Sequence, residues 1–281
     1  MKTSTQLKAR IRNLSKKINV SNEVLFRTFM LERFLERVSL SKYKDNFILK
    51  GGMLIASIIG IDIRSTMDMD AIIKGWKLTE NELSEICTHI INIDIDDGTE
   101  FSLSSIKEII EDADYPGYRI SFDVRFDKTR QVIKIDVAIG DSITPKEIEY
   151  EYKLMFEDRS INILASNIET VLADKLEATI SRSITNTRMR DFYDIYIITS
   201  TQTFNHDIFK DAFNRLIVIK NLSEQVNEIM KIIQKISDSN IMIDLWKRYQ
   251  VNNSYASEIS WTSIISAIKS LALIIKGGES E

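Results

Sequence analysis

The chain has 281 residues, of which 44% are hydrophobic and 28% charged, and its formal net charge at pH 7 is −4. This composition is ordinary for a globular protein with one large domain or two smaller ones. No run of 18 apolar residues predicts a membrane span, and the basic N-terminus lacks the apolar segment of a secretory signal. The single cysteine, Cys87, excludes an internal disulfide, so the sequence predicts a cytoplasmic protein that does not contact membranes.

Charge is distributed unevenly along the chain. Residues 1–50 contain twelve basic and four acidic residues, a net charge of +8, whereas the other 231 residues carry a net charge of −12. Apolar periodicity predicts two helices in the basic segment, near Gln6–Ile18 and Ser21–Val38. The basic residues either form the solvated faces of these helices or meet a phosphate backbone, and both interpretations stay open.

A pair of glycines follows the first predicted strand. The apolar run Phe47–Leu49 leads into Gly51 and Gly52, and a helix is predicted from Met53 to Ile59. Glycine lets the backbone approach a bound phosphate closely, and the start of a helix offers free N–H groups to an anion. We therefore expect the two glycines to contact a bound phosphate.

A second predicted strand, Met67–Ile73, carries two aspartates. Asp68 and Asp70 are separated by one residue, so their side chains share a face of the strand and lie roughly 7 Å apart along the backbone. Two carboxylates this close repel each other unless a cation lies between them. The spacing predicts a site for Mg²⁺ or Mn²⁺.

A predicted hairpin follows a predicted helix over Glu80–Asn92. Tyr118–Phe126 alternates apolar and polar residues, Asp127–Arg130 is a predicted turn, and Gln131–Ile139 is the partner strand. The isoleucines and valine at alternate positions of the partner strand share one face. Asp136 therefore lies on the opposite, polar face.

From Asn167 onward the pattern predicts helices only. Four amphipathic helices are predicted after residue 200: Asp207–Val218, Ser223–Ser237, Ile241–Tyr249 and Glu258–Ile275. In the predicted helix Asn167–Ser183, Lys175 lies beside the apolar stripe, on a face with Arg182. In the predicted helix Arg190–Thr199, Asp191 and Asp194 share a face, and Arg190 is in reach of Asp194.

Four separated segments resemble a known family. The glycine pair followed by Thr66-Met67-Asp68-Met69-Asp70 is similar to the first motif of the polymerase-β type nucleotidyltransferase superfamily. The segments KGGMLIASIIGIDIRSTMDMDAII, Ile135-Asp136-Val137, LADKLEA and RDFYDIY, in this order, resemble the AbiEii family. Its members are the toxins of AbiE-type abortive-infection toxin–antitoxin systems, which act in antiviral defence.

The resemblance implies an α/β (α+β) fold, a nucleotidyltransferase-type mixed sheet flanked by helices and followed by an all-helical C-terminal domain. We expect the first domain to span residues 1–164 and the second residues 165–281, with the second contributing motifs to the active-site cleft. The implied reaction is Mg²⁺-dependent transfer of a nucleoside monophosphate from an NTP to an acceptor hydroxyl, with release of pyrophosphate.

The resemblance also assigns roles to residues. Those implied in catalysis are Asp68, Asp70, Asp136, Lys175 and Asp191, of which Asp68, Asp70 and Asp136 would bind the metal. Those implied in nucleotide binding are Gly51, Gly52, Thr66, Lys175, Arg182 and Asp194. Asp123 shows a pattern similar to that of Asp136 and is the alternative third carboxylate. Without the resemblance, Lys175 would be interpreted as a solvated lysine.

The partners implied are an RNA acceptor, such as tRNA, and a cognate antitoxin that acts with or without direct contact. Two alternatives stay open: transfer of the nucleotide to a small molecule, and a regulatory module that binds nucleotide without turnover. The sequence leaves open the preferred NTP, the acceptor and the oligomeric state.

Overall fold

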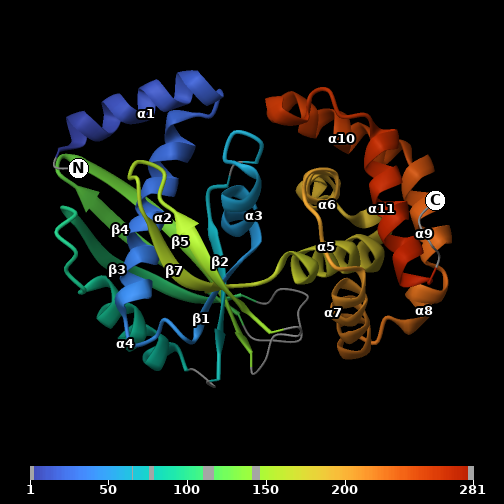
Figure 1. Ribbon diagram of the computed structural model, residues 1–281, viewed down its shortest axis with the longest axis horizontal. Coiled ribbons are helices and arrows are strands. Elements are labelled where there is room, and N and C mark those ends of the chain that lie inside the picture. Colours follow the sequence, from blue (N-terminus) through green and yellow to red (C-terminus); the bar gives the residue numbers. More distant parts are fainter. Residues whose placement is uncertain (1–2, 65, 76–78, 110–116, 141–145, 278–281) are drawn as a thin grey trace. The chain divides into compact units, whose positions relative to one another are not determined.

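The computed structural model describes residues 3–64, 66–75, 79–109, 117–140 and 146–277. The chain divides into two compact units, Met1–Ser166 and Asn167–Glu281 (Figure 1). Every described strand belongs to the first unit, and the described part of the second unit is helical. None of the described helices is long and apolar enough to cross a membrane.

The first unit is built on one mixed sheet. Its strands are β1 (Phe47–Lys50), β2 (Met69–Lys74), β3 (Thr99–Ile109), β4 (Gly117–Phe126), β5 (Thr129–Gly140), β6 (Ile148–Lys153) and β7 (Ser160–Ala165). Its helices are α1 (Ser4–Ile18), α2 (Asn22–Leu40), α3 (Gly51–Ile59) and α4 (Glu80–Ile91). The strand order is β3-β4-β5-β2-β1-β7-β6; β2 pairs with β5 and β1 with β7 in parallel, and the other pairs are antiparallel. The predicted mixed sheet flanked by helices is confirmed.

Helix α2 covers the apolar face of the sheet. Along β4 and β5 alternate side chains are buried, as the period of two predicts. The ring of Phe34 on α2 lies 5.2 Å from the ring of Phe122 and 6.3 Å from that of Phe47, measured between centroids. The core of the first unit therefore lies between α2 and this face.

A helix of the first unit covers part of the opposite face. Helix α3 packs against β1 and β2, on the side to which Asp70 points. On β3, β4 and β5 many side chains that point to this side are exposed. We call this the open face, and its charged residues on these three strands are Glu100, Lys107, Arg119, Asp123, Arg125, Arg130, Lys134 and Asp136.

The structure differs from the predicted elements at several points. Strands β3, β6 and β7 were not predicted individually, because they are polar or short, and β3 also contains a bulge after Leu103. The predicted turn over Asp127–Arg130 is shorter, since β5 already begins at Thr129 and Asp127 has a φ of +51°. The helix predicted over Ser223–Ser237 is interrupted at Glu228.

Part of the N-terminal basic charge is buried. Arg37 donates to both carboxylate oxygens of Asp97, at 2.9 and 3.0 Å. Arg33 lies 3.0 Å from Glu36 and 2.8 Å from Glu157. These two arginines of α2 therefore neither form a solvated face nor meet a phosphate backbone. The basic residues of α1, in contrast, are exposed.

All the described regular elements of the second unit are helices. They are α5 (Ile168–Arg182), α6 (Met189–Thr201), α7 (His206–Ile219), α8 (Ser223–Asn227), α9 (Ile229–Asp238), α10 (Asn240–Asn252) and α11 (Trp261–Ile275). Asn167 caps α5 by accepting the N–H of Thr170 at 2.8 Å. Trp246, which is buried, donates its indole N–H to the carbonyl oxygen of Ile259 at 3.0 Å. The predicted all-helical C-terminal region is confirmed.

Glu32 is a carboxyl group inside the core of the first unit. Its side chain accepts the backbone N–H of Met155 at 3.1 Å, and the residue is 2% exposed. Burial raises the pKa of Glu32 to about 8, although Arg33 and the hydrogen bond from Met155 both lower it. The folded protein therefore retains a proton on Glu32 at a pH where the unfolded chain has released it.

This linkage predicts a pH-dependent stability. As the pH rises from 4.5, the ordinary pKa of a glutamate, to about 8, the unfolded state loses its proton first, and the free energy of unfolding falls by a few kcal/mol. Glu32→Gln keeps an acceptor for Met155 and removes the titration, so its free energy of unfolding should fall less over this range. Urea unfolding at about pH 5, 7 and 9 measures the difference, with the exposed Glu23→Gln as control. Parallel pH profiles for wild type and Glu32→Gln would contradict the burial of an ionisable carboxyl group.

Candidate active site

Helix α3 begins at the glycine pair, and the carboxylate of Asp70 from β2 lies against its first turn. Oδ2 of Asp70 accepts the backbone N–H of Gly52 at 3.2 Å. Gly51 has a φ of +63°, and a Cβ at this position would overlap Oδ2 of Asp70. The partial positive charge at the start of a helix stabilises an ionised carboxylate at this place. The start of α3 therefore holds the carboxylate of Asp70, a candidate catalytic residue. The contact of the two glycines with a phosphate stays a prediction.

The second glycine makes room for two other side chains. A Cβ on Gly52 would overlap Nη1 of Arg64 and would lie 2.7 Å from Oγ1 of Thr66. Both residues are buried, and Thr66 donates to the carbonyl oxygen of Asp68 at 3.1 Å. Thr66 thus braces the turn that carries Asp68. Sequence reasoning missed Arg64, because a single arginine between the glycines and the aspartates forms no pattern.

Three predicted carboxylates come together in the first unit. Asp70 lies directly opposite Asp136 in the parallel pairing of β2 with β5, and Asp68 precedes β2. Partial loss of hydration raises the pKa of Asp68, and the nearby Asp136 and Asp70 raise it further, whereas Arg27 and Lys134 lower it. The three carboxylates therefore share one electrostatic environment that favours an added positive charge.

Asp136 and its alternative, Asp123, have different neighbours. Arg119 donates to both oxygens of Asp136, Nε at 2.8 Å and Nη2 at 2.6 Å. Asp123 lies on β4, one strand further from β2, and the hydrogen bond from Arg130 lowers its pKa. Of the two, the register brings Asp136 alone next to Asp70. Sequence reasoning missed Arg119, because its partner depends on the register of the hairpin.

The donor set fits a magnesium ion. Mg²⁺ sites in nucleotide enzymes commonly use one or two carboxylates together with substrate phosphates and water. Asp68 and Asp70 provide such a pair, and the N–H of Gly52 fixes the orientation of Asp70. Among the described residues, no three acidic, histidine or cysteine side chains stand ready to hold a metal ion. Both oxygens of Asp136 are bonded to Arg119.

The two segments singled out in the second unit meet at Lys175. Its amine forms an ion pair with Asp191 and lies 3.4 Å from Oδ2 of Asp194. Asp194 is 0% exposed, whereas the side chain of Lys175 is 19% exposed. Lys175 is therefore not the solvated lysine of the alternative interpretation. The contribution of Lys175, Asp191 and Asp194 to nucleotide binding stays a prediction, as does that of Arg182 at the end of α5.

The charge of this cluster limits its chemistry. One ammonium and two carboxylates carry a net charge of −1. The two aspartates fix the amine in one place, which favours preorganised stabilisation of charge on a ligand.

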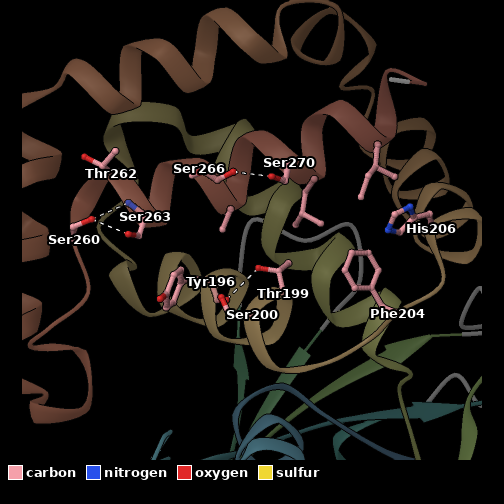
Figure 2. Close-up of a pocket in the computed structure, with 13 residues that line it drawn as sticks. Tyr196, Thr199, Ser200, Phe204, His206, Ser260, Thr262, Ser263, Ser266 and Ser270 are labelled. Carbon is pink, nitrogen blue, oxygen red and sulfur yellow. Dashed lines mark hydrogen bonds between the residues drawn. The ribbon is translucent and has the colours of Figure 1, made fainter. Parts of the chain in front are cut away.

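The second unit also contains a cavity of about 610 Å³. Figure 2 shows hydroxyl groups of α6 and α11 around it, among them Thr199 and Ser263, with Phe204 and His206 at one end. Its lining includes neither Lys175 nor the two aspartates that bind it. The cavity is separate from the cluster of charged residues.

The burial of Asp194 makes Lys175 important for stability. In Lys175→Ala the carboxylate of Asp194 remains buried without its ammonium, which should lower the free energy of unfolding by about 3 kcal/mol. Lys231→Ala is the matched control, because its partner Glu228 is exposed and the urea midpoint should not change. Urea unfolding measures both variants. Equal midpoints for the two variants would show that Lys175 does not stabilise the second unit.

Comparisons with known proteins identify a family for this chain. Residues 33–262 match the family model described as nucleotidyl transferase AbiEii toxin, type IV toxin–antitoxin system. The comparison with curated proteins found no match.

Two solved structures share the fold. One is a candidate nucleotidyltransferase from Helicobacter pylori, with 17% identity, a TM-score of 0.52 and coverage of 92% of this chain and 97% of the other. JHP933 from Helicobacter pylori gives the same identity and TM-score over 92% of this chain and 94% of its own. The family match spans most of the chain, including both groups of charged residues. The chain therefore belongs to the AbiEii family of nucleotidyltransferase toxins of type IV toxin–antitoxin systems.

Proposed function

We propose that this chain is a toxin that transfers a nucleoside monophosphate from an NTP to a hydroxyl group of an RNA acceptor in the cytoplasm, with Mg²⁺ or Mn²⁺ bound and pyrophosphate released. The observation that carries the proposal is the group of three carboxylates at the start of α3. Asp70 is seated on the N–H of Gly52, Asp136 lies opposite it in the sheet, and Asp68 is coupled to both by charge.

In this proposal the three carboxylates together hold the cation. Asp136 also accepts the proton of the attacking acceptor hydroxyl on a carboxylate oxygen that the cation does not use. When bound, the cation supplies Lewis-acid polarisation of the α-phosphate and lowers the pKa of the hydroxyl. Asp70 needs no reorientation for its task, because its hydrogen bond to α3 already fixes the carboxylate.

The second unit supplies the positive charge for the leaving phosphates. We propose that Lys175, held by Asp191 and Asp194, donates to the pyrophosphate portion of the same NTP that the carboxylates of the first unit bind. Arg182 adds a second cation on the same helix. Charge-assisted hydrogen bonds of this kind stabilise the negative charge that develops on a departing phosphate.

Helix α1 supports RNA as the acceptor. It carries five basic residues and no acidic residue, and its basic side chains are exposed: Lys8, Arg10, Arg12, Lys16 and Lys17. Such a face binds a phosphate backbone by releasing counterions, so the binding weakens as salt rises.

The type IV toxin–antitoxin family implies an antitoxin as a further partner.

A labelling assay tests the proposed reaction. Purified protein is incubated with Mg²⁺, each α-labelled NTP in turn and total bacterial RNA, and the products are resolved on a denaturing gel. The wild type should label RNA, and Asp68→Asn, Asp70→Asn and Asp136→Asn should each reduce labelling by more than about 10²-fold, because each removes a group that acts on the transition state.

Asp123→Asn is the matched control for Asp136→Asn, since both aspartates form a bidentate pair with an arginine on the open face. It should retain labelling. The reverse result would make Asp123 the third carboxylate. Nucleotide binding without any labelled product would instead support a regulatory module that binds nucleotide without turnover.

A further inference from the structure

A row of charged side chains crosses the open face from Asp70. Asp70 is paired in register with Asp136, Asp136 with Arg119, and Arg119 with Lys107 on β3. Partners in register point to the same face of a sheet, and neighbouring strands lie about 4.8 Å apart. The row therefore leads from the carboxylates to Lys107 over about 14 Å.

A second row runs beside the first. Lys134 precedes Ile135, whose partner is Met69, so Lys134 lies level with Asp68. It is exposed and close enough to Asp68 to lower the pKa of that carboxyl group. Arg119, Lys107 and Lys134 are all exposed and surround the β4 side of the carboxylates.

Arg119 and a cation would compete for Asp136. The guanidinium already uses both oxygens of Asp136, and its side chain is 44% exposed. If a cation binds the carboxylate of Asp136 instead, the guanidinium of Arg119 loses these two hydrogen bonds and lies beside the metal. A planar guanidinium with two parallel N–H donors is well suited to a phosphate group.

The two sides of the carboxylates are not equivalent. The start of α3, with Gly51 and Gly52, lies on the side of β1 and β2. Arg119 and Lys107 lie on the side of β4 and β3. Because the proposed nucleotide phosphates belong to the α3 side, the basic side chains on β3 and β4 are placed for the acceptor.

We propose that Lys107 and Lys134 bind backbone phosphates of the RNA acceptor, and that Arg119 joins them when a divalent cation takes Asp136. This inference rests on the proposed function. It assigns a binding surface to the acceptor and makes Arg119 a positioning residue whose partner changes from a carboxylate to a phosphate.

Binding measurements test the inference without relying on turnover. Fluorescence anisotropy records the affinity of the full chain for a short labelled single-stranded RNA at low salt, with and without Mn²⁺. Arg119→Gln should weaken RNA binding about tenfold with Mn²⁺ and less than about twofold without it, because Arg119 is otherwise bound to Asp136. Arg119→Lys keeps the charge without the fork and should give an intermediate effect.

Arg130→Gln is the matched control. Arg130 pairs with Asp123 through the same two donors on the same two strands. It should change RNA affinity less than about twofold in either condition. The inference is overturned if Arg130→Gln weakens binding as much as Arg119→Gln, or if the effect of Arg119→Gln is the same without Mn²⁺.

Two further measurements separate the possible failures. Titration with Mn²⁺ alone should show that Arg119→Gln binds Mn²⁺ about threefold more tightly than wild type, with no such gain when Asp136→Asn is also present.

The affinity of Arg119→Gln for a non-hydrolysable NTP with Mn²⁺ should stay within about twofold of that of wild type. A larger loss would assign Arg119 to the nucleotide and overturn the inference. Unchanged Mn²⁺ binding in Asp70→Asn would instead refute the metal site of the proposed function.

Discussion

The seating of the Asp70 carboxylate on the first turn of α3 is the contact on which the candidate site depends. The start of α3 lies so close to β2 that the carboxylate of Asp70 fills the space that a Cβ on Gly51 would need. The hydrogen bond from Gly52 then fixes one oxygen of Asp70. A larger residue in place of Gly51 would displace this carboxylate from the start of α3, and Asp70 would lose its fixed orientation beside Asp136.

The two units hold their charged groups in opposite ways. In the first unit Asp68 and Asp70 add negative charge to a place where Arg119 compensates only Asp136. In the second unit two carboxylates hold a single ammonium, that of Lys175. The first arrangement favours a cation, and the second offers a fixed amine to a phosphate. A nucleoside triphosphate with a divalent cation carries both kinds of partner, as the proposed function requires.

Local patterns in the sequence were sufficient for much of the fold and for the face on which Asp136 lies. The strand predicted over Met67–Ile73 begins only at Met69, so Asp68 precedes the strand and does not share it with Asp70. Period-two alternation placed Asp136 on the polar face of its strand, and the glycine pair marked the start of α3. Partners across the chain could not be predicted in this way. Arg119 meets Asp136, and Arg130 meets Asp123, because the hairpin turns after Asp127, and a shift of one residue would have exchanged the faces.

Burial of charge was equally hidden from local patterns. Helical spacing placed Arg33 and Arg37 outside the apolar stripe of α2, but acidic residues from distant loops cover them. In the same way, Asp194 could be matched with Arg190 one turn away, whereas the structure shows it in an ion pair with Lys175 on the preceding helix. Such contacts follow from how helices and loops pack together, and the spacing of residues within one element does not contain this information.

The most direct test of the central claim is a crystal structure of the full chain with Mg²⁺ and a non-hydrolysable NTP analogue. Our account predicts the cation between Asp68 and Asp70, with the phosphates of the same nucleotide in contact with Lys175. A nucleotide bound in the hydroxyl-lined cavity of the second unit, or phosphates in contact with only one of the two charged groups, would contradict it.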